Sequence, residues 1–329
     1  MAFYSYIFSA NYRRFFKNLS VIAKKEKRFF PGLVWDTGWC VFRYGMALTD
    51  YLNYEIYRRN RKERKAYLGT RKENAFYETV SPAAYKKRFT VKQNFLREFK
   101  DYTRRDCIVP GEDSFEAFCE FLDKNPQFMS KPYDGLGGQD VKKVNTADIT
   151  DRQAYYDNCV ENRIFLEQLV HQHPDMNVLC PASVNTMRIM TFNDNGKSEI
   201  LWMGLRVGNG VNAVDNFHAQ GMAVAIDMET GKLKGEAIDK DCNRYRVHPT
   251  TNVTFDGFQI PDFQAAKELV LKGALESDKI LVIGWDVALS EDGPVVIEAN
   301  RRPGFDIVQV LDGRGRKDMV ESVLARVKK

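Results

Sequence analysis

The sequence of 329 residues lacks long apolar runs, paired cysteines and a familiar nucleophilic catalytic set. No stretch approaches the roughly 18 uninterrupted apolar residues that a membrane-spanning helix needs. The N-terminus has aromatic residues mixed with arginines, which makes it a poor signal peptide. The 6 cysteines are scattered without a CxxC pair, so buried free thiols are favoured over disulfides or a zinc site. No Ser-His-Asp or Cys-His set is apparent among the 4 histidines. Because the N-terminus is a poor signal peptide and the cysteines are unpaired, we expect a cytoplasmic protein.

Positive charge and aromatic residues gather in the first third of the chain. Up to Arg105 there are 24 Lys and Arg against 9 Asp and Glu, and 24 of the 41 aromatic residues. Helical spacing of apolar residues predicts helices within residues 3–30 and one helix from Asp50 to Tyr67. These basic helices fit two interpretations: a helix pair whose lysines and arginines are simply solvated, or a surface that docks onto something anionic. A membrane surface, an acidic glycan or a partner enzyme would suit the second; nucleic acid ranks lower because no recognition motif accompanies the charge.

After Arg105 the pattern alternates between helices and strands. Strands are predicted at 128–131, 141–144, 164–170, 186–193, 199–207, 222–227, 280–289 and 295–300, and helices at 114–122, 151–162, 262–277 and 316–328. Ser114 is the expected N-cap of the first of these helices. We expect an α/β protein with α+β subdomains, divided into a basic helical region 1–105, a central subdomain 106–175 and a C-terminal subdomain 176–329.

A hairpin near the C-terminus is predicted to place two carboxylates opposite each other. Two apolar strands flank the turn from Ser290 to Gly293, and a turn centred near Asp292 pairs Asp286 with Glu298. Alternation then gives one face to Asp286, Ala288, Val296, Glu298 and Asn300, and the core face to Trp285, Val287, Val295 and Ile297. Facing carboxylates repel, and a cation between them would offset this repulsion. Oxygen ligands suit Mg²⁺; the plain alternative is an exposed acidic strand face.

A glycine-rich segment follows a predicted strand at residues 131–140. Gly135, Gly137 and Gly138 fit neither the Walker pattern nor GxGxxG, and a strand rather than a helix comes next. A hairpin with bare amide groups could close over a polyphosphate, with Lys131 supplying a positive charge. Taken alone, such a turn between strands is more often structural than functional.

Several motifs together resemble those of the ATP-grasp superfamily, and specifically its sugar-transfer-associated group. In order they are Lys92 in FTVKQNF, the KP strand with its glycine-rich loop, FLEQLV, SVNTMRIMTF, DNFHAQG, GWDVAL and EANRRPGFD. The string from Glu298 to Gly304 also resembles the C-terminal metal motif of D-alanine:D-alanine ligases. The resemblance covers roughly residues 45 to 312. It implies an ATP-grasp fold, with ATP and one or two Mg²⁺ ions as cofactors.

The resemblance assigns most of the site residues to ATP and its metal. Lys92 and Lys131 would neutralise phosphates, and the loop with Asp134, Gly135, Gly137, Gly138 and Gln139 would close over them. The hinge Glu167, Gln168, Leu169 and Val170 would bind adenine, mainly through backbone amides. Asp175 or His173 would lie near the ribose, and Mg²⁺ would be held by Asp286, Glu298 and Asn300.

Further residues are assigned to the transferred group and the acceptor. Arg188 would meet the transferred phosphoryl group. Arg302 stands two residues after Asn300, where biotin carboxylase-like members also place an arginine and D-alanine ligase-like members do not, and it would orient an acyl phosphate. Arg206, Asn216 and His218 are candidates for the acceptor pocket, although His218 also fits a surface or packing role.

The implied activity is an ATP-dependent carboxylate–amine ligase that works through an acyl phosphate, in surface polysaccharide or glycoconjugate biosynthesis. Its substrates would be a small-molecule or glycan-linked carboxylate and an amine, and its location cytoplasmic or peripheral at a membrane. A glycosyltransferase is a further candidate partner of the basic region. Two alternatives stay open: a phosphotransferase acting on a sugar hydroxyl, and a non-catalytic ATP-binding partner of a glycosyltransferase. Retention of Lys131 and of the metal-ligand trio argues against the second.

Overall fold

The computed structural model describes residues 11–85, 88–89, 91–133, 141–210, 221–277 and 279–327. The chain forms two compact units. The helical unit contains the chain up to Pro82 together with the segment from Arg302 onward, and the sheet unit runs from Ala83 to Arg301. The division predicted from the sequence, with boundaries after residues 105 and 175, is a different partition and stays a prediction.

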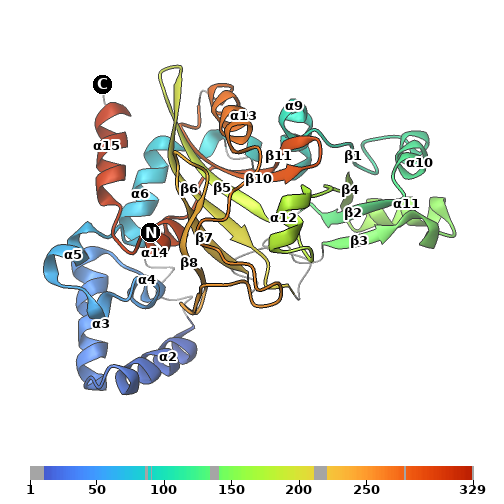
Figure 1. The fold of residues 1–329 in the computed structure, drawn as a ribbon. Coiled ribbons are helices and arrows are strands. Elements are labelled where there is room, and N and C mark those ends of the chain that lie inside the picture. Colours follow the sequence, from blue (N-terminus) through green and yellow to red (C-terminus); the bar gives the residue numbers. More distant parts are fainter. Residues whose placement is uncertain are drawn as a thin grey trace. The chain divides into compact units, whose positions relative to one another are not determined.

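The helical unit is built from short amphipathic helices around an aromatic core. Its helices are α2 (Tyr12–Lys25), α3 (Phe30–Tyr44), α4 (Leu48–Asn53), η1 (Ile56–Arg58), α5 (Arg61–Ala66), α6 (Thr70–Val80), α14 (Phe305–Asp312) and α15 (Lys317–Val327). The helices α2 and α3 lie against each other (Figure 1). Phe15, Leu19, Leu33, Tyr51 and Tyr67 are buried in the core that these helices share. The basic N-terminal region is therefore mainly helical, as predicted.

The single helix predicted from Asp50 to Tyr67 is wrong, because the chain breaks there into α4, η1 and α5. Glu55 adopts φ 50° and ψ 41°, a left-handed conformation that ends a right-handed helix. Asn60 then starts a new helix: its side chain accepts hydrogen bonds from the backbone N–H groups of Lys62 and Glu63. A strong N-cap thus lies where the sequence pattern indicated a continuous helix.

A four-stranded antiparallel sheet forms one part of the sheet unit. Its strand order is β1 (Cys107–Ile108), β4 (Ile164–Gln168), β2 (Gln127–Pro132) and β3 (Lys142–Asn145). The helices α10 (Phe115–Lys124) and α11 (Arg152–Glu161) pack on it through Phe118, Phe128, Cys159 and Leu166 (Figure 1). Ser114 caps α10 as predicted, accepting a hydrogen bond from the N–H of Ala117.

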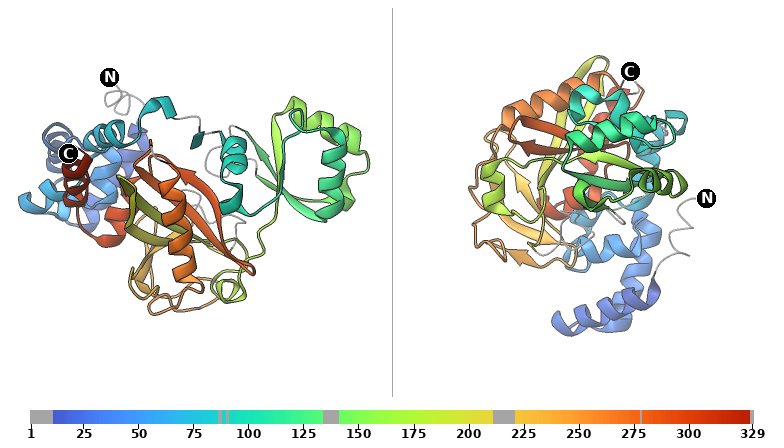
Figure 2. Two further views of the ribbon diagram at one scale, coloured as in Figure 1. Left: turned by 90° about the horizontal axis from the view of Figure 1, so that it is seen from above. Right: turned by 90° about the vertical axis from the view of Figure 1, so that its right-hand side faces the viewer.

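A seven-stranded antiparallel sheet forms the rest of this unit. Its order is β11 (Gly293–Asn300), β10 (Val282–Ser290), β5 (Thr186–Asp194), β6 (Lys197–Val207), β7 (Met222–Ile226), β8 (Leu233–Asp239) and β9 (Arg244–Tyr245). The remaining named elements are η2 (Ala83–Tyr85), α8 (Lys92–Glu98), α9 (Lys100–Thr103), η3 (Thr146–Asp148), α12 (Pro174–Leu179) and α13 (Phe263–Leu275). The helix α13, orange in Figure 2, lies along one face of the sheet and packs against Trp285, Ile189 and Met203. This face of the sheet is therefore buried in the hydrophobic core.

The hairpin β10–β11 pairs Asp286 with Glu298 as predicted, but it does so through a β-bulge. Beyond that pair the register shifts by one residue, so that Val287 lies opposite Val296 and Ser290 opposite Gly293. The extra residue reverses the alternation of side chains in β11. Val296, not Val295, therefore joins Trp285 and Val287 in the core, and the predicted faces of Val295 and Val296 were wrong.

Candidate functional site

Charged side chains occupy the face of the seven-stranded sheet that α13 does not cover. Arg188 on β5 lies opposite Asp286 on β10, and Asp286 in turn lies opposite Glu298 on β11. Arg206 on β6 is two residues from Gly204, the partner of Arg188, and therefore shares its face. Adjacent antiparallel strands thus bring two arginines and two carboxylates together. These four residues form the sheet cluster.

Asp286 is held by both arginines of the sheet cluster. Arg188 Nε lies 2.5 Å from Asp286 Oδ1, and Arg188 Nη2 donates to Oδ2 at 3.1 Å. Arg206 Nη1 also donates to Oδ2, at 2.9 Å. The Asp286 side chain is only 3% exposed. Two guanidinium groups therefore compensate the charge of the carboxylate that we expected to need a cation.

Glu298 is the carboxylate that the arginines leave more accessible. Its Oε1 accepts a hydrogen bond from Asn300 Nδ2 at 3.0 Å, and the residue is half-buried. Burial acts to raise the pKa of Glu298, but the bond from Asn300 and the charges of Arg188 and Arg206 outweigh it, so the pKa lies below its ordinary value. Glu298 is consequently ionised at neutral pH and can serve as a hard oxygen ligand.

A second charged group, the hinge cluster, comprises Glu167, Arg105 and Lys131. Glu167 on β4 forms ion pairs with Arg105 and with Lys131 on β2, and its side chain is 3% exposed. Burial acts to raise the pKa of Glu167, but the charges of Arg105 and Lys131 outweigh it and the pKa is lowered. A buried carboxylate needs such partners.

Arg105 is a site residue that sequence reasoning missed. It is 6% exposed, and its Nη2 donates to Glu167 and, at 3.4 Å, to the carbonyl oxygen of Ile297. Its Nε and Nη1 atoms have no hydrogen-bond partner among the described residues. The neighbouring Arg104 is exposed. Nothing in the local sequence distinguishes the two, so only the fold identifies Arg105 as a buried cation with unused donors.

Lys92, at the start of α8, connects the two clusters electrostatically. Burial lowers the pKa of Lys92, with a further decrease from Lys131, while Glu298 and Glu167 act in the opposite direction. The lysine thus feels carboxylates from both clusters. Together the sheet cluster, the hinge cluster and Lys92 contain five cationic side chains against three carboxylates. The excess of two positive charges favours a ligand with several negative charges.

The other predicted hinge and ribose residues lie along the chain after β4. Leu169 and Val170 follow the strand and are half-buried, and the Gln168 side chain accepts a hydrogen bond from the N–H of Asp106 at 3.2 Å. Asp175 lies in the first turn of α12 with its side chain 68% exposed. His173 Nδ1 accepts a hydrogen bond from the N–H of Asp175 at 3.1 Å, which makes His173 the N-cap of that helix.

Eight predicted residues fall outside the described part of the sheet unit. Arg302 belongs to the helical unit, so its predicted role stays a prediction. Seven others lie outside the described residues: Asp134, Gly135, Gly137, Gly138, Gln139, Asn216 and His218.

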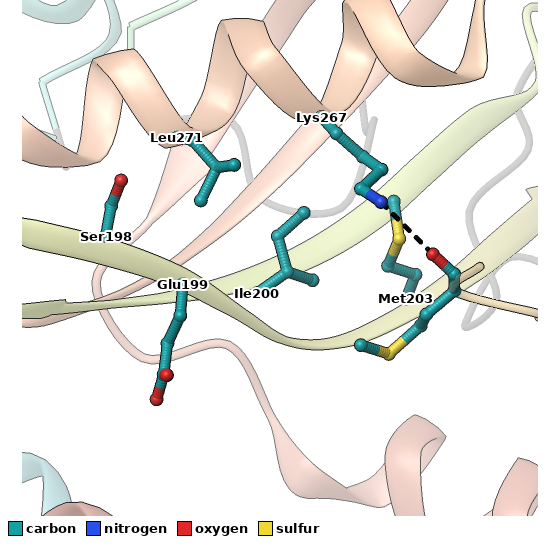
Figure 3. Close-up of a pocket in the computed structure, with 7 residues that line it drawn as sticks. Ser198, Glu199, Ile200, Met203, Lys267 and Leu271 are labelled. Atoms are coloured by element: carbon teal, nitrogen blue, oxygen red, sulfur yellow. Dashed lines mark hydrogen bonds between the residues drawn. The ribbon is translucent and has the colours of Figure 1, made fainter.

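A surface depression of about 240 Å³ lies between β6 and α13. Ile200, Met203 and Leu271 line it, and Lys267 at its edge donates to the carbonyl oxygen of Met228 at 3.2 Å (Figure 3). Met203 points to the α13 face of the sheet, whereas Arg206 points to the opposite face. The depression is therefore separate from the charged clusters.

The two carboxylates of the sheet cluster and the neighbouring Asn300 suit a magnesium ion. Glu298, Asn300 and Asp286 offer carboxylate and amide oxygens, which are the hard ligands that Mg²⁺ prefers. Among the described residues no group of three or more His, Cys, Asp or Glu side chains could hold a metal ion. An ion here would therefore depend on the Asn300 amide and on phosphate oxygens of a bound nucleotide, which is the usual arrangement for Mg²⁺.

Comparison with known protein families identifies the fold. The model of the family described as "Sugar-transfer associated ATP-grasp" matches residues 107–325, about two thirds of the chain. The chain belongs to this family. It therefore has an ATP-grasp fold, preceded by a basic helical region.

The solved structures that match the chain are distant in sequence. The chain resembles the ATP-grasp ligase PsnB complexed with minimal precursor, at 15% identity and a TM-score of 0.45, covering 75% of this chain and 64% of PsnB. It also resembles D-alanyl-alanine synthetase A from Vibrio cholerae (13% identity, TM-score 0.41, 74% and 66% covered) and D-cycloserine synthetase DcsG (14%, 0.40, 74% and 73%). The chain thus spans less than two thirds of the length of PsnB. No curated protein matches it.

Proposed function

We propose that this protein is an ATP-dependent carboxylate–amine ligase. The observation that carries the proposal is the charge arrangement: an excess of two positive charges beside Glu298 and Asn300, which offer oxygen ligands. A nucleotide polyphosphate with a divalent ion would be complementary to both parts. Membership of an ATP-grasp family supports the same conclusion.

The chain's own residues would share the binding of nucleotide and metal. Lys92 and Lys131 would contact phosphates, together with the loop containing Asp134 and Gln139, and the backbone from Glu167 to Val170 would bind adenine. Glu298 and Asn300, with Asp286, would hold one or two Mg²⁺ ions. When bound, the metal would neutralise part of the phosphate charge. Lys131 and Arg105 keep Glu167 compensated, so that Glu167 adds no uncompensated negative charge beside the phosphates.

The reaction would proceed in two displacements. A carboxylate oxygen of the first substrate attacks the γ-phosphorus of ATP; the bond to the β-phosphate oxygen breaks, leaving ADP and an acyl phosphate. The amine nitrogen of the second substrate then attacks the acyl carbon, inorganic phosphate leaves, and the nitrogen loses a proton as the amide forms. Such chemistry needs positioning and charge neutralisation more than a side-chain nucleophile.

Arg188 and Arg206 are placed to neutralise the anionic groups in these steps. Asp286 fixes both guanidinium groups on the open face of the sheet. An arginine held in this way can meet a carboxylate or phosphoryl group without losing much side-chain entropy. Arg302 would orient the acyl phosphate, and Asn216 and His218 would contribute to the acceptor pocket.

We further propose a sugar-linked carboxylate and an amino acid or similar amine as the substrates, in surface polysaccharide or glycoconjugate biosynthesis. The reverse assignment follows the same chemistry: the amino acid would supply the carboxylate, and an aminosugar would supply the amine that receives the aminoacyl group. The support for both is the sugar-transfer association of the family. The side chains of the sheet cluster favour an anionic first substrate without selecting among carboxylates.

The test is to trap the acyl phosphate before any amine is present. The protein is incubated with ATP, Mg²⁺, hydroxylamine and panels of amino acids, uronic acids and carboxylated nucleotide sugars. A ligase should release ADP and give a hydroxamate that mass spectrometry detects. Glu298→Gln should abolish both products, while Glu291→Gln, an exposed residue at the tip of the same hairpin, should not. A stable phosphate ester without hydroxamate would refute the ligase and identify a phosphotransferase.

A further inference from the structure

The helical unit exposes an aromatic stripe on α3. Trp35, Trp39 and Phe42 are 77%, 54% and 78% exposed, and their spacing of four and three residues places them on one face of the helix. The opposite face, with Leu33 and Tyr44, is buried in the core of the unit. A helix that is apolar on both sides normally has a partner on each. The stripe is therefore a candidate contact surface.

The exposure of these tryptophans is a local property of α3. The chain contains 4 tryptophans, and the other two, Trp202 and Trp285, are 3% and 0% exposed. Residues on the same side of α3 as the stripe include Pro31, Gly32 and Gly38. These three carry no side-chain hydrogen-bonding group. The surface around the rings is therefore suited to hydrocarbon more than to the hydroxyl groups of a sugar chain.

Basic residues accompany the stripe on α2 and α3. Residues 11–45 contain eight lysines and arginines, all exposed: Arg13, Arg14, Lys17, Lys24, Lys25, Lys27, Arg28 and Arg43. The two acidic residues of this segment, Glu26 and Asp36, pair with Arg58 at 2.5 Å and with Arg64 at 2.6 Å. The net charge of +6 is thus carried by exposed side chains, while both acidic groups are engaged with arginines from outside the segment.

We propose that the α2–α3 pair docks onto the surface of an anionic lipid bilayer. Trp35, Trp39 and Phe42 would enter the interface between headgroups and acyl chains, and the exposed lysines and arginines of residues 11–45 would contact anionic headgroups. Exposed aromatic rings flanked by basic residues are the combination that binds such interfaces. Among the described residues no helix is long and apolar enough to cross a membrane, so α3 would lie along the surface.

Vesicle binding by the full chain tests the proposal, because the exposed tryptophans report directly on the stripe. Vesicles of equal parts phosphatidylcholine and phosphatidylglycerol should carry the protein in a flotation gradient and shift its tryptophan emission to shorter wavelength. Vesicles of phosphatidylcholine alone should bind the protein at least about tenfold more weakly. Added salt should release the protein from the anionic vesicles.

Two variants and a control separate the contributions of the rings and the charges. Phe42→Ser keeps all 4 tryptophans and should weaken vesicle binding about tenfold. Lys24→Glu combined with Lys25→Glu should weaken it by about tenfold or more. Lys232→Glu with Lys234→Glu changes the same charge at exposed positions of the sheet unit and should leave binding unchanged.

Four outcomes would overturn the proposal. The first is an unchanged emission spectrum with anionic vesicles. The second is equal binding by the α2 charge variant and its control. The third is an equal emission shift and equal affinity with a soluble acidic polysaccharide, which would identify a glycan surface instead. Emission that already reports four buried tryptophans in buffer would count against it as well, because another part of the chain would then cover α3.

Discussion

Asp286→Asn and Glu298→Gln should both remove ATP turnover but should differ in their effect on stability. Each substitution neutralises one of two carboxylates that face each other across β10 and β11. Asp286, however, holds Arg188 and Arg206, whose side chains are only 17% and 12% exposed. Glu298 accepts one hydrogen bond from Asn300, and a glutamine carbonyl oxygen can accept the same bond.

The expected difference in stability follows from these contacts. Removing one partner of a buried ion pair costs about 3–5 kcal/mol. An asparagine at position 286 still offers an oxygen to one arginine, so we expect about 3 kcal/mol for Asp286→Asn. For a unit of this size this corresponds to a melting temperature lower by roughly 6–12 °C. Glu298→Gln should change the free energy of unfolding by about 1 kcal/mol or less.

Urea unfolding followed by tryptophan fluorescence measures this difference in the relevant unit. Trp202 and Trp285 are buried and both belong to the sheet unit, so their exposure reports its unfolding. ADP release measures turnover in the same preparations. Equal stability of the two variants would show that Asp286 is not the anchor of the arginines. Full turnover by Glu298→Gln would refute the metal-binding assignment.

Three further predictions concern the hinge cluster and the helical unit. Lys131→Ala should weaken nucleotide binding or turnover by about 10 to 1,000-fold, measured by calorimetry and ADP release, and unchanged values of both would contradict its phosphate contact. Arg105→Met should weaken ATP binding by about tenfold, while the exposed Arg104→Met should not; equal affinities would exclude a role for the buried guanidinium. Burial, with the charge of Asp306, raises the pKa of Glu73 from 4.5 to about 8, so the folded state retains a proton that the unfolded chain releases. The ionisation of Glu73 should therefore lower the stability of the helical unit by about 2–4 kcal/mol between pH 5 and pH 8, and Glu73→Gln should remove this part of the pH dependence; identical pH profiles in urea unfolding would contradict it.

Eight strands of the sheet unit, β2 to β7 with β10 and β11, were predicted because their signals are local, whereas β1, β8 and β9 were missed. The short runs of apolar residues in β5 and β6 and the turn at Ser290–Gly293 depend on neighbours in the sequence. The break near Glu55 had no such signal. A non-glycine residue with positive φ is stabilised by the packing around it, and the sequence at that point favours continued helix. The prediction of one helix there was wrong for this reason.

The candidate site was predictable to the extent that it depends on register. The pairing of Asp286 with Glu298 follows from the hairpin turn, and the bulge next to the pair left it intact. The contacts of Arg105 and Arg206, in contrast, could not be predicted from the register of one hairpin. The contact of Arg105 with Glu167 joins residues 62 positions apart, and that of Arg206 with Asp286 joins residues 80 apart. Only the order of strands in the two sheets brings these residues together, and that order is a property of the whole fold.

The facing carboxylates show why chemistry inferred from spacing can be right in kind and incomplete in detail. Two negative charges across a strand pair require positive charge nearby, and the sequence supported a metal ion as its source. In the folded chain, Arg188 and Arg206 supply the positive charge that contacts Asp286. From the sequence, we had assigned these two arginines to the transferred phosphoryl group and the acceptor pocket. The same two guanidinium groups lower the pKa of Glu298 and so keep a ligand oxygen ionised. Asp286 would thus have two roles in the proposed reaction. It fixes the arginines that would meet the phosphoryl group, and through these arginines it helps to keep Glu298 ionised for metal binding.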